Sequence, residues 1–127
     1  MKGIFWNIRG LGMKGRKQRV AELCVQNNLD FIGIQESKKE SFHENYLSSL
    51  AGGRNFCWKW LPSIGASGGI LMGVNADLLE VLNWEVKTFS VSCTVKIGWM
   101  TILLLSQLSM ALPRMREKKI SLLNYLN

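Results

Sequence analysis

Two short apolar segments that end in the same way constrain the fold of this chain more than any other feature. Residues 4–6 (Ile-Phe-Trp) run directly into Asn7, and residues 31–34 (Phe-Ile-Gly-Ile) run through Gln35 into Glu36. Short, continuous apolar runs of this kind are typical of strands buried in a sheet. We therefore predict two buried strands, each of which delivers polar side chains at its carboxyl end.

The segment between these strands has the pattern of an amphipathic helix. Within residues 16–28, Val20, Leu23 and Cys24 recur at the three- and four-residue spacing of one helix face, and the asparagines that follow favour a helix end. Strand, helix and strand in this order predict a βαβ unit with parallel strands and a right-handed crossover.

Parallel strands bring their carboxyl ends to one edge of a sheet, so Asn7 and Glu36 are expected to converge there. A carboxylate beside a neutral amide suits a hard divalent cation and a phosphate, because the carboxylate supplies the charge and the amide orients an oxygen. The alternative is that both are ordinary strand-end residues that face solvent or cap the next turn. The spacing alone leaves both interpretations open.

The charge balance makes nucleic acid a candidate partner. The formal net charge is +7, and four basic residues follow the first strand in a glycine-rich segment: Lys14, Arg16, Lys17 and Arg19. Such a segment either contacts phosphates or forms a solvated helix face. Phosphate contacts alone predict weak, electrostatic DNA binding.

Cysteine usage and hydropathy indicate an intracellular protein, nuclear or cytoplasmic. The three cysteines lack C-x-x-C spacing, and the first residues lack a charged-then-apolar leader, so we expect reduced thiols and no structural zinc. Residues 99–112 are the most apolar stretch, but polar residues interrupt it and it is shorter than the roughly 20 residues that span a bilayer. No membrane association is expected.

The rest of the chain reads as the continuation of one domain, residues 1–127, in which strands follow one another directly. A short amphipathic helix is predicted over residues 41–50, and Pro113 followed by helically spaced apolar residues predicts a last helix over residues 113–126. Strands are predicted within the segments rich in β-branched and aromatic residues, at 56–62, 68–74, 78–98 and 99–105.

Other motif matches are weaker. Residues 65–69 fit the G-x-S-x-G string of serine hydrolases, but a strand follows and no histidine lies downstream, so a hairpin entry with close backbone approach is favoured. His43 lacks partners at metal-ligand spacing and is predicted to occupy an exposed helix position. Trp58, Trp60 and Trp84 alternate like core residues of strands, which favours packing over stacking on bases.

Three segments carry a family resemblance: FWNIRGLG, LDFIGIQESK and GASGGILMGVN, in this order. They resemble the amino-terminal half of the endonuclease/exonuclease/phosphatase superfamily, and within it the endonuclease domain of plant non-LTR (LINE-type) retrotransposons, over residues 1–96. The resemblance implies a two-sheet α/β sandwich and Mg²⁺-dependent cleavage of DNA phosphodiesters. It identifies Asn7 with the family's active-site asparagine and Glu36 with its metal-binding glutamate, with Gln35 and Lys38 as motif neighbours. Lys38 is added to the predicted DNA-binding residues.

The chain departs from the family pattern after residue 96. The expected Tyr-Gly-Pro turn is replaced, no aspartate follows Asp77, and His43 is the only histidine, so the water-positioning aspartate and the Asp-His pair of the family have no counterpart. We therefore predict a truncated domain in which residues 97–127 are degenerate and catalysis is incomplete. The expected fold class is α/β (α+β): a partial two-layer half-sandwich, with a mixed sheet and helices on one face. An uncovered sheet face would promote self-association. The alternative is a non-catalytic basic module that binds DNA or another partner.

Overall fold

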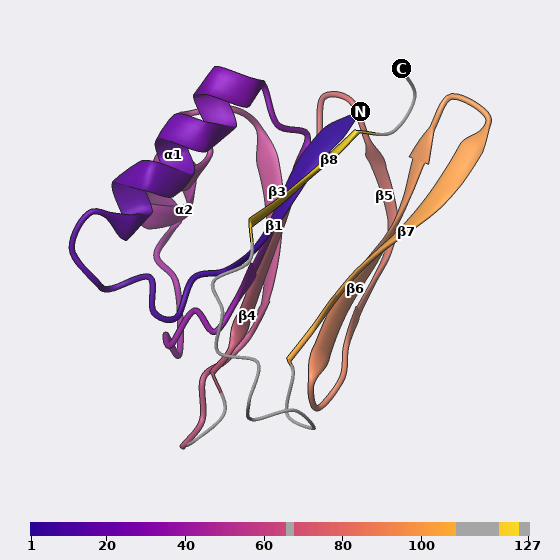
Figure 1. Cartoon of the computed structure of the whole chain (residues 1–127). Helices are drawn as coiled ribbons and strands as arrows, with labels where there is room; N and C mark the ends of the chain where they lie inside the picture. Colours follow the sequence, from indigo (N-terminus) through magenta and orange to yellow (C-terminus); the bar gives the residue numbers. More distant parts are fainter. Residues whose placement is uncertain (66–67, 109–119, 125–127) are drawn as a thin grey trace.

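The computed structural model describes residues 1–65, 68–108 and 120–124. Figure 1 shows three layers: two helices, a five-stranded sheet and a three-stranded sheet. The elements in chain order are β1 (Lys2–Asn7), α1 (Arg16–Asn27), β2 (Phe31–Gln35), α2 (Glu44–Leu50), β3 (Phe56–Leu61), β4 (Ile70–Asn75), β5 (Glu80–Val86), β6 (Ser90–Ile97), β7 (Met100–Gln107) and β8 (Ile120–Asn124).

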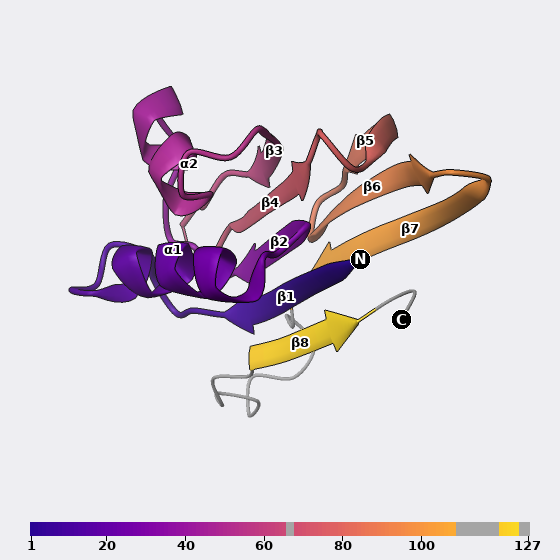
Figure 2. The same cartoon turned by 90° about the horizontal axis from the view of Figure 1, so that it is seen from above.

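The five-stranded sheet has the order β3-β4-β2-β1-β8, which Figure 2 shows as a row. The central strands β1 and β2 are parallel, with Gly3 opposite Phe31 and Asn7 opposite Gln35, whereas the other pairings are antiparallel. The predicted βαβ unit is therefore present, and the mixed sheet agrees with the expected fold class.

Both helices cover one face of this sheet. Val20 and Cys24 of α1 are buried against it, and Asn28 ends α1 in the left-handed conformation (φ 50°), as its sequence position indicated. Helix α2 begins at Glu44 rather than Ser41, because the ring Nδ1 of His43 accepts a hydrogen bond from the Asn45 N–H and caps the helix. Neither of the two helices in the described part of the chain has the length and apolar character needed to cross a membrane.

The second face of the five-stranded sheet is covered, contrary to the expectation of an exposed face. The antiparallel sheet β5-β6-β7 packs on it, and Val91, Cys93 and Val95 of β6 are buried together with Met72 and Val74 of β4. Burial, with a smaller contribution from the Cys57 thiol, raises the pKa of the Cys93 thiol to about 12. The sequence predicted strands in these segments, but the packing of their sheet on the other one depends on contacts between distant residues, which local patterns do not reveal.

One element prediction was wrong. Ile120–Asn124 forms strand β8, antiparallel to β1, instead of part of a helix over residues 113–126; the remainder of that predicted helix lies outside the described residues. The free edge of β1 offers a row of backbone donors and acceptors that helical periodicity in the sequence does not reveal. The segment 78–98 forms two strands, because the Lys87 N–H donates to the Ser90 carbonyl oxygen in a turn.

Glycine and phenylalanine alternate across the central strand pair. Each glycine lies opposite an aromatic ring: Gly3 opposite Phe31, and Gly33 opposite Phe5. A Cβ added at Gly3 or Gly33 would lie 2.1 Å or 2.3 Å from the facing ring, so each ring occupies the space above its glycine. The two rings also contact each other, with centroids 5.5 Å apart. These contacts hold β1 and β2 in one register.

We expect Gly33→Ala to destabilise the protein by about 1–3 kcal/mol, the usual cost of overpacking a tight core, because the Phe5 ring would have to leave its position. Gly12→Ala is the matched control, since a Cβ there meets no atom within 4 Å. The free energy of unfolding in urea measures both. Equal stability of the two variants would contradict this account of the strand pair.

Candidate active site

The rim where β1 and β2 end is held by a backbone ladder that continues past both strands. The N–H groups of Gly10 and Leu11 donate to the carbonyl oxygens of Glu36 and Ser37, at 2.7 and 3.0 Å. On the other side, the Ser37 N–H donates to the Gly69 carbonyl oxygen at 3.2 Å. The segment that carries Glu36 is therefore fixed between the loop after β1 and the entry to β4.

The backbone at this rim is strained. Four residues other than glycine have positive φ in the described chain, and three of them lie here: Arg9 (54°), Glu36 (53°) and Lys38 (56°). The fourth is the helix cap Asn28. Such conformations cost of order 1–3 kcal/mol each and persist only where the surroundings enforce them, which is common at active sites. The strain marks this rim as a candidate site on physical grounds.

Gly68 gives Glu36 its position. A Cβ at Gly68 would lie 2.8 Å from Glu36 Cγ and 3.0 Å from Glu36 Cα, so only glycine allows the glutamate to lie against this strand entry. The close backbone approach predicted for the Gly-Gly pair is thus present. Of the rival G-x-S-x-G string, Ala66 and Ser67 lie outside the described residues, and strand β4 follows it.

Asn7 and Gln35 are paired neighbours that belong to the sheet face covered by β5-β6-β7. They follow Phe5 and Phe31 in the strand alternation, and the Gln35 side-chain amide donates to the Gln107 carbonyl oxygen at 2.6 Å. The Asn7 Oδ1 atom is buried without a hydrogen-bond partner among the described residues. An unpaired buried acceptor is costly, and a ligand at the rim would satisfy it.

The structure therefore places Asn7 and Glu36 at adjacent positions of one rim, whereas their binding role stays a prediction. Sequence reasoning missed two participants: Gln35 as the link between the sheets, and Ser106, whose buried Oγ also lacks a partner among the described residues. Gln35 was identified only as a motif neighbour without an assigned role. Ser106 carried no sequence signal, because the strand β7 that brings it to this end comes from the second sheet.

The donor set fits a divalent cation that keeps most of its own water. No group of three histidine, cysteine, aspartate or glutamate side chains suited to a metal occurs in the part of the chain that the structure describes. One carboxylate, Glu36, and one uncommitted amide oxygen, on Asn7, remain. Mg²⁺ is commonly held by one or two carboxylates together with water and substrate phosphate oxygens, and this rim offers that minimum.

Some of the predicted basic residues contact other parts of the protein, whereas others are free to contact a ligand. Arg16 donates to the carbonyl oxygens of Ile8 and Arg9, so its guanidinium closes the rim loop onto α1, and Arg19 pairs with Glu22 at 3.5 Å. Lys17 lies over the Tyr46 ring, 4.6 Å from its centroid. Lys14 and Lys38 are exposed, and their side chains make no hydrogen bond or ion pair with described residues.

Comparison with known proteins identifies a family for the sequence and solved structures of similar fold. The sequence model of the endonuclease/exonuclease/phosphatase family matches residues 4–110. No curated protein matches the chain.

Three solved structures illustrate the likeness of fold. Humanized TDP2 of D. rerio is 12% identical with a TM-score of 0.62, over 88% of this chain and 49% of that one. The AP endonuclease LMAP of Leishmania major is 13% identical with a TM-score of 0.62, over 84% and 39%. TDP2 of C. elegans is 19% identical with a TM-score of 0.54, over 82% and 34%. The chain thus spans less than half the length of each, and at these identities the likeness concerns the fold.

We expect Glu36→Gly to stabilise the protein by up to about 1 kcal/mol, because glycine adopts a φ of 53° without the steric cost that glutamate bears. Glu36→Gln should leave stability nearly unchanged, since it keeps the side-chain size and the strain. Glu22→Gly in the middle of α1 is the control and should destabilise by about 1 kcal/mol. Thermal and urea unfolding of the three variants measure these differences; a loss of stability on Glu36→Gly would show that the rim is unstrained.

Proposed function

Because the chain belongs to the endonuclease/exonuclease/phosphatase family, we propose that it is the amino-terminal half of a DNA-binding phosphodiesterase domain of retrotransposon origin. The motifs W-N-x-R-G-L-G, Q-E-S-K and S-G-G-I-L, at residues 6–12, 35–38 and 67–71, support a LINE-type source. One of the structures of similar fold is TDP2 of D. rerio "complexed with single strand DNA product", which supports DNA as the ligand class.

The observation that carries the proposal is the strained, doubly anchored backbone at Glu36 beside the unpaired Oδ1 of Asn7. Glu36 would hold Mg²⁺, which when bound supplies positive charge to a phosphate oxygen. Asn7 would orient a phosphate oxygen or a water through its amide without adding charge. Lys14 and Lys38 would contact neighbouring phosphates, and Arg16 would keep the loop that carries Arg9 in place.

The groups needed for turnover are not among these residues. The single histidine, His43, caps α2 through its Nδ1, and the last aspartate is Asp77. General-base catalysis and stabilisation of developing charge are each commonly worth on the order of a hundredfold or more in rate. We propose that these groups belong to the part of the family domain that the 127 residues do not contain, and that this chain binds DNA without cleaving it.

DNA affinity should fall steeply with salt concentration, because phosphate contacts release counterions. The double variant Lys14→Gln/Lys38→Gln should reduce the slope of log K against log salt by about two for duplex DNA, close to one per contact. Lys59→Gln/Lys87→Gln, which removes the same charge from β3 and the β5–β6 turn, is the control and should leave the slope unchanged. Fluorescence anisotropy with a labelled duplex measures both; equal slopes would refute the assigned phosphate contacts.

Supercoiled plasmid should not be nicked above background in Mg²⁺, because the catalytic set is incomplete. Nicking that EDTA inhibits and that Glu36→Gln abolishes would overturn the inactive assignment and establish an enzyme. Salt-sensitive binding without any effect of Mg²⁺ or of Glu36→Gln would instead favour the non-catalytic basic module.

We further propose that the chain self-associates through β7. Leu103 and Leu105 lie on its outer side with exposed fractions of 62% and 45%, and β7 is one of the two end strands of its sheet among the described strands. An apolar end strand pairs readily with another copy. Leu103→Lys should shift the chain toward monomer in size-exclusion chromatography with light scattering, whereas Val25→Lys, which also places a charge at an exposed apolar position but on helix α1, should not. A monomeric parent chain would refute this proposal.

A further inference from the structure

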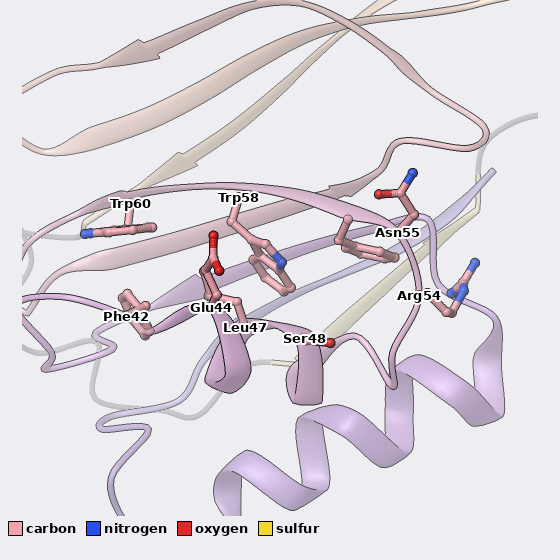
Figure 3. A pocket seen from close by; sticks show the side chains of 9 residues that line it. Phe42, Glu44, Leu47, Ser48, Arg54, Asn55, Trp58 and Trp60 are labelled. Carbon is pink, nitrogen blue, oxygen red and sulfur yellow. The ribbon is translucent and has the colours of Figure 1, made fainter.

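A pocket of about 450 Å³ lies between α2 and β3, on the helix-covered face of the five-stranded sheet (Figure 3). Asn7 belongs to the opposite face of that sheet, so the pocket is distinct from the rim site. Phe56, Trp58 and Trp60 line it from alternate positions of β3, and Phe42 closes one end.

These aromatic residues pack against the core but are not fully buried in it. Phe56, Trp58 and Trp60 are half-buried, so part of each ring surface remains accessible. Phe56 and Trp58 lie with ring centroids 5.6 Å apart and planes tilted by 33°, whereas Phe42 meets Trp60 edge-on at 5.4 Å. The rings of β3 therefore form an aromatic wall, and the Phe42 ring meets its Trp60 end at an interplanar angle of 67°. Such a wall suits a flat ligand that stacks.

The charged group available in this pocket is a hydrogen-bond acceptor. Figure 3 shows the Glu44 carboxylate, from the first turn of α2, directed toward the side of Trp58 and Trp60. Glu44 is exposed and makes no hydrogen bond or ion pair with described residues. Arg54, in contrast, is engaged: it donates to the Leu29 carbonyl oxygen and lies 3.7 Å from an Asp30 carboxylate oxygen. The pocket thus offers a carboxylate to a ligand that donates hydrogen bonds.

Positive charge lies between the pocket and the rim. The Lys39 ammonium is 4.7 Å from the Tyr46 ring centroid and 6.0 Å from that of Phe42. In the sheet register, Trp60 is opposite Leu71, which is opposite Ile34 near the end of β2. Two strand spacings, about 10 Å, therefore separate the Trp60 backbone from the strand that delivers Glu36. A polyanion at the rim could pass Lys39 and reach the pocket.

We propose that this pocket binds an unpaired nucleobase with an exocyclic amino group (adenine, cytosine or guanine, but not thymine) from a single strand whose phosphates lie along Lys39. The aromatic wall stacks on the base, the Glu44 carboxylate accepts from the amino group, and Lys39 neutralises the adjoining phosphate. A small methylated ammonium would also favour rings and a carboxylate, but it fills little of 450 Å³ and is opposed by the net charge of +7. The proposal extends the proposed function to base recognition, and it needs neither Mg²⁺ nor Glu36.

The direct test is NMR of the tryptophan indole N–H signals during titration with short oligonucleotides in EDTA. Hexamers of deoxyadenylate and of deoxycytidylate should shift the Trp58 and Trp60 signals but not that of Trp99, which is 89% exposed at the β6–β7 turn. A hexamer of abasic sites with the same charge should bind about tenfold more weakly and leave the indole signals unshifted, because stacking is lost. Equal binding of abasic and base-bearing strands would overturn the proposal, as would shifts produced by tetramethylammonium and not by the hexamers.

Variants separate base recognition from folding and from the rim site. Glu44→Gln, at an exposed position, should remove the preference for deoxycytidylate over thymidylate, whereas Glu22→Gln on α1 should keep it. Trp60→Leu should weaken hexamer binding about tenfold. A thermal transition equal to that of the parent protein would exclude a folding defect in this variant. If Trp60→Leu lowers the transition, the comparison of Glu44→Gln with Glu22→Gln tests base recognition instead. Glu36→Gln should leave the indole shifts intact, so failure of the rim proposal and failure of this one give different results.

Discussion

The parallel pairing of β1 with β2 is the constraint on which the rest of the structure depends. Gly3 and Gly33 lie beneath the rings of Phe31 and Phe5, and this interlock fixes a register in which Asn7 lies opposite Gln35. A slip by one residue would turn every side chain of a strand to the other face of the sheet. The helix core, the intersheet core and the rim all require the observed register, because each uses alternate residues of these two strands.

The two ends of this strand pair differ in how fully their buried polar groups are hydrogen-bonded. At the amino end of β2, the buried Asp30 carboxylate accepts hydrogen bonds from the backbone N–H of Lys2 at 3.0 Å and from the Asn75 side-chain amide at 3.1 Å. The Arg54 guanidinium lies 3.7 Å from the same carboxylate. At the carboxyl end, the Oδ1 of Asn7 is buried and unpaired among described residues. A satisfied network stabilises a fold, whereas unmet hydrogen-bond capacity with strained backbone is typical of a functional site. The asymmetry supports a stabilising role for the Asp30 end and agrees with the binding role proposed for the Asn7 end.

The proposed rim site and the aromatic pocket use opposite faces of one sheet and share a connecting segment. Residues 36–39 carry Glu36 at one end and Lys39 at the other, and the Ser63 N–H donates to the Lys39 carbonyl oxygen at 2.9 Å, which ties this segment to the chain after β3. Phosphate and base recognition would thus be mechanically linked, since a movement of residues 36–39 alters both. Two of the predicted basic residues also have structural contacts. Arg16 donates hydrogen bonds to backbone carbonyl oxygens, and the Lys17 ammonium lies over the Tyr46 ring.

The sequence by itself determined the features that local periodicity encodes. The apolar runs before Asn7 and Glu36, the spacing of Val20 and Cys24, and the asparagine at the end of α1 predicted the βαβ unit. The family motifs covered the same region, which the family match over residues 4–110 includes. These features depend on contacts between residues that are near in sequence, or on the geometric rule that parallel strands end together.

Only the tertiary structure decided the rest. Ile120–Asn124 pairs with β1 across most of the chain length, so a segment with helical spacing became a strand. The positive φ of Glu36 arises from hydrogen bonds to segments on both sides of it, and the pocket arises where α2 crosses β3. The physical reason is common to all three: their energies come from backbone pairing and packing between distant segments, and such energies leave no periodic trace in the sequence of either partner.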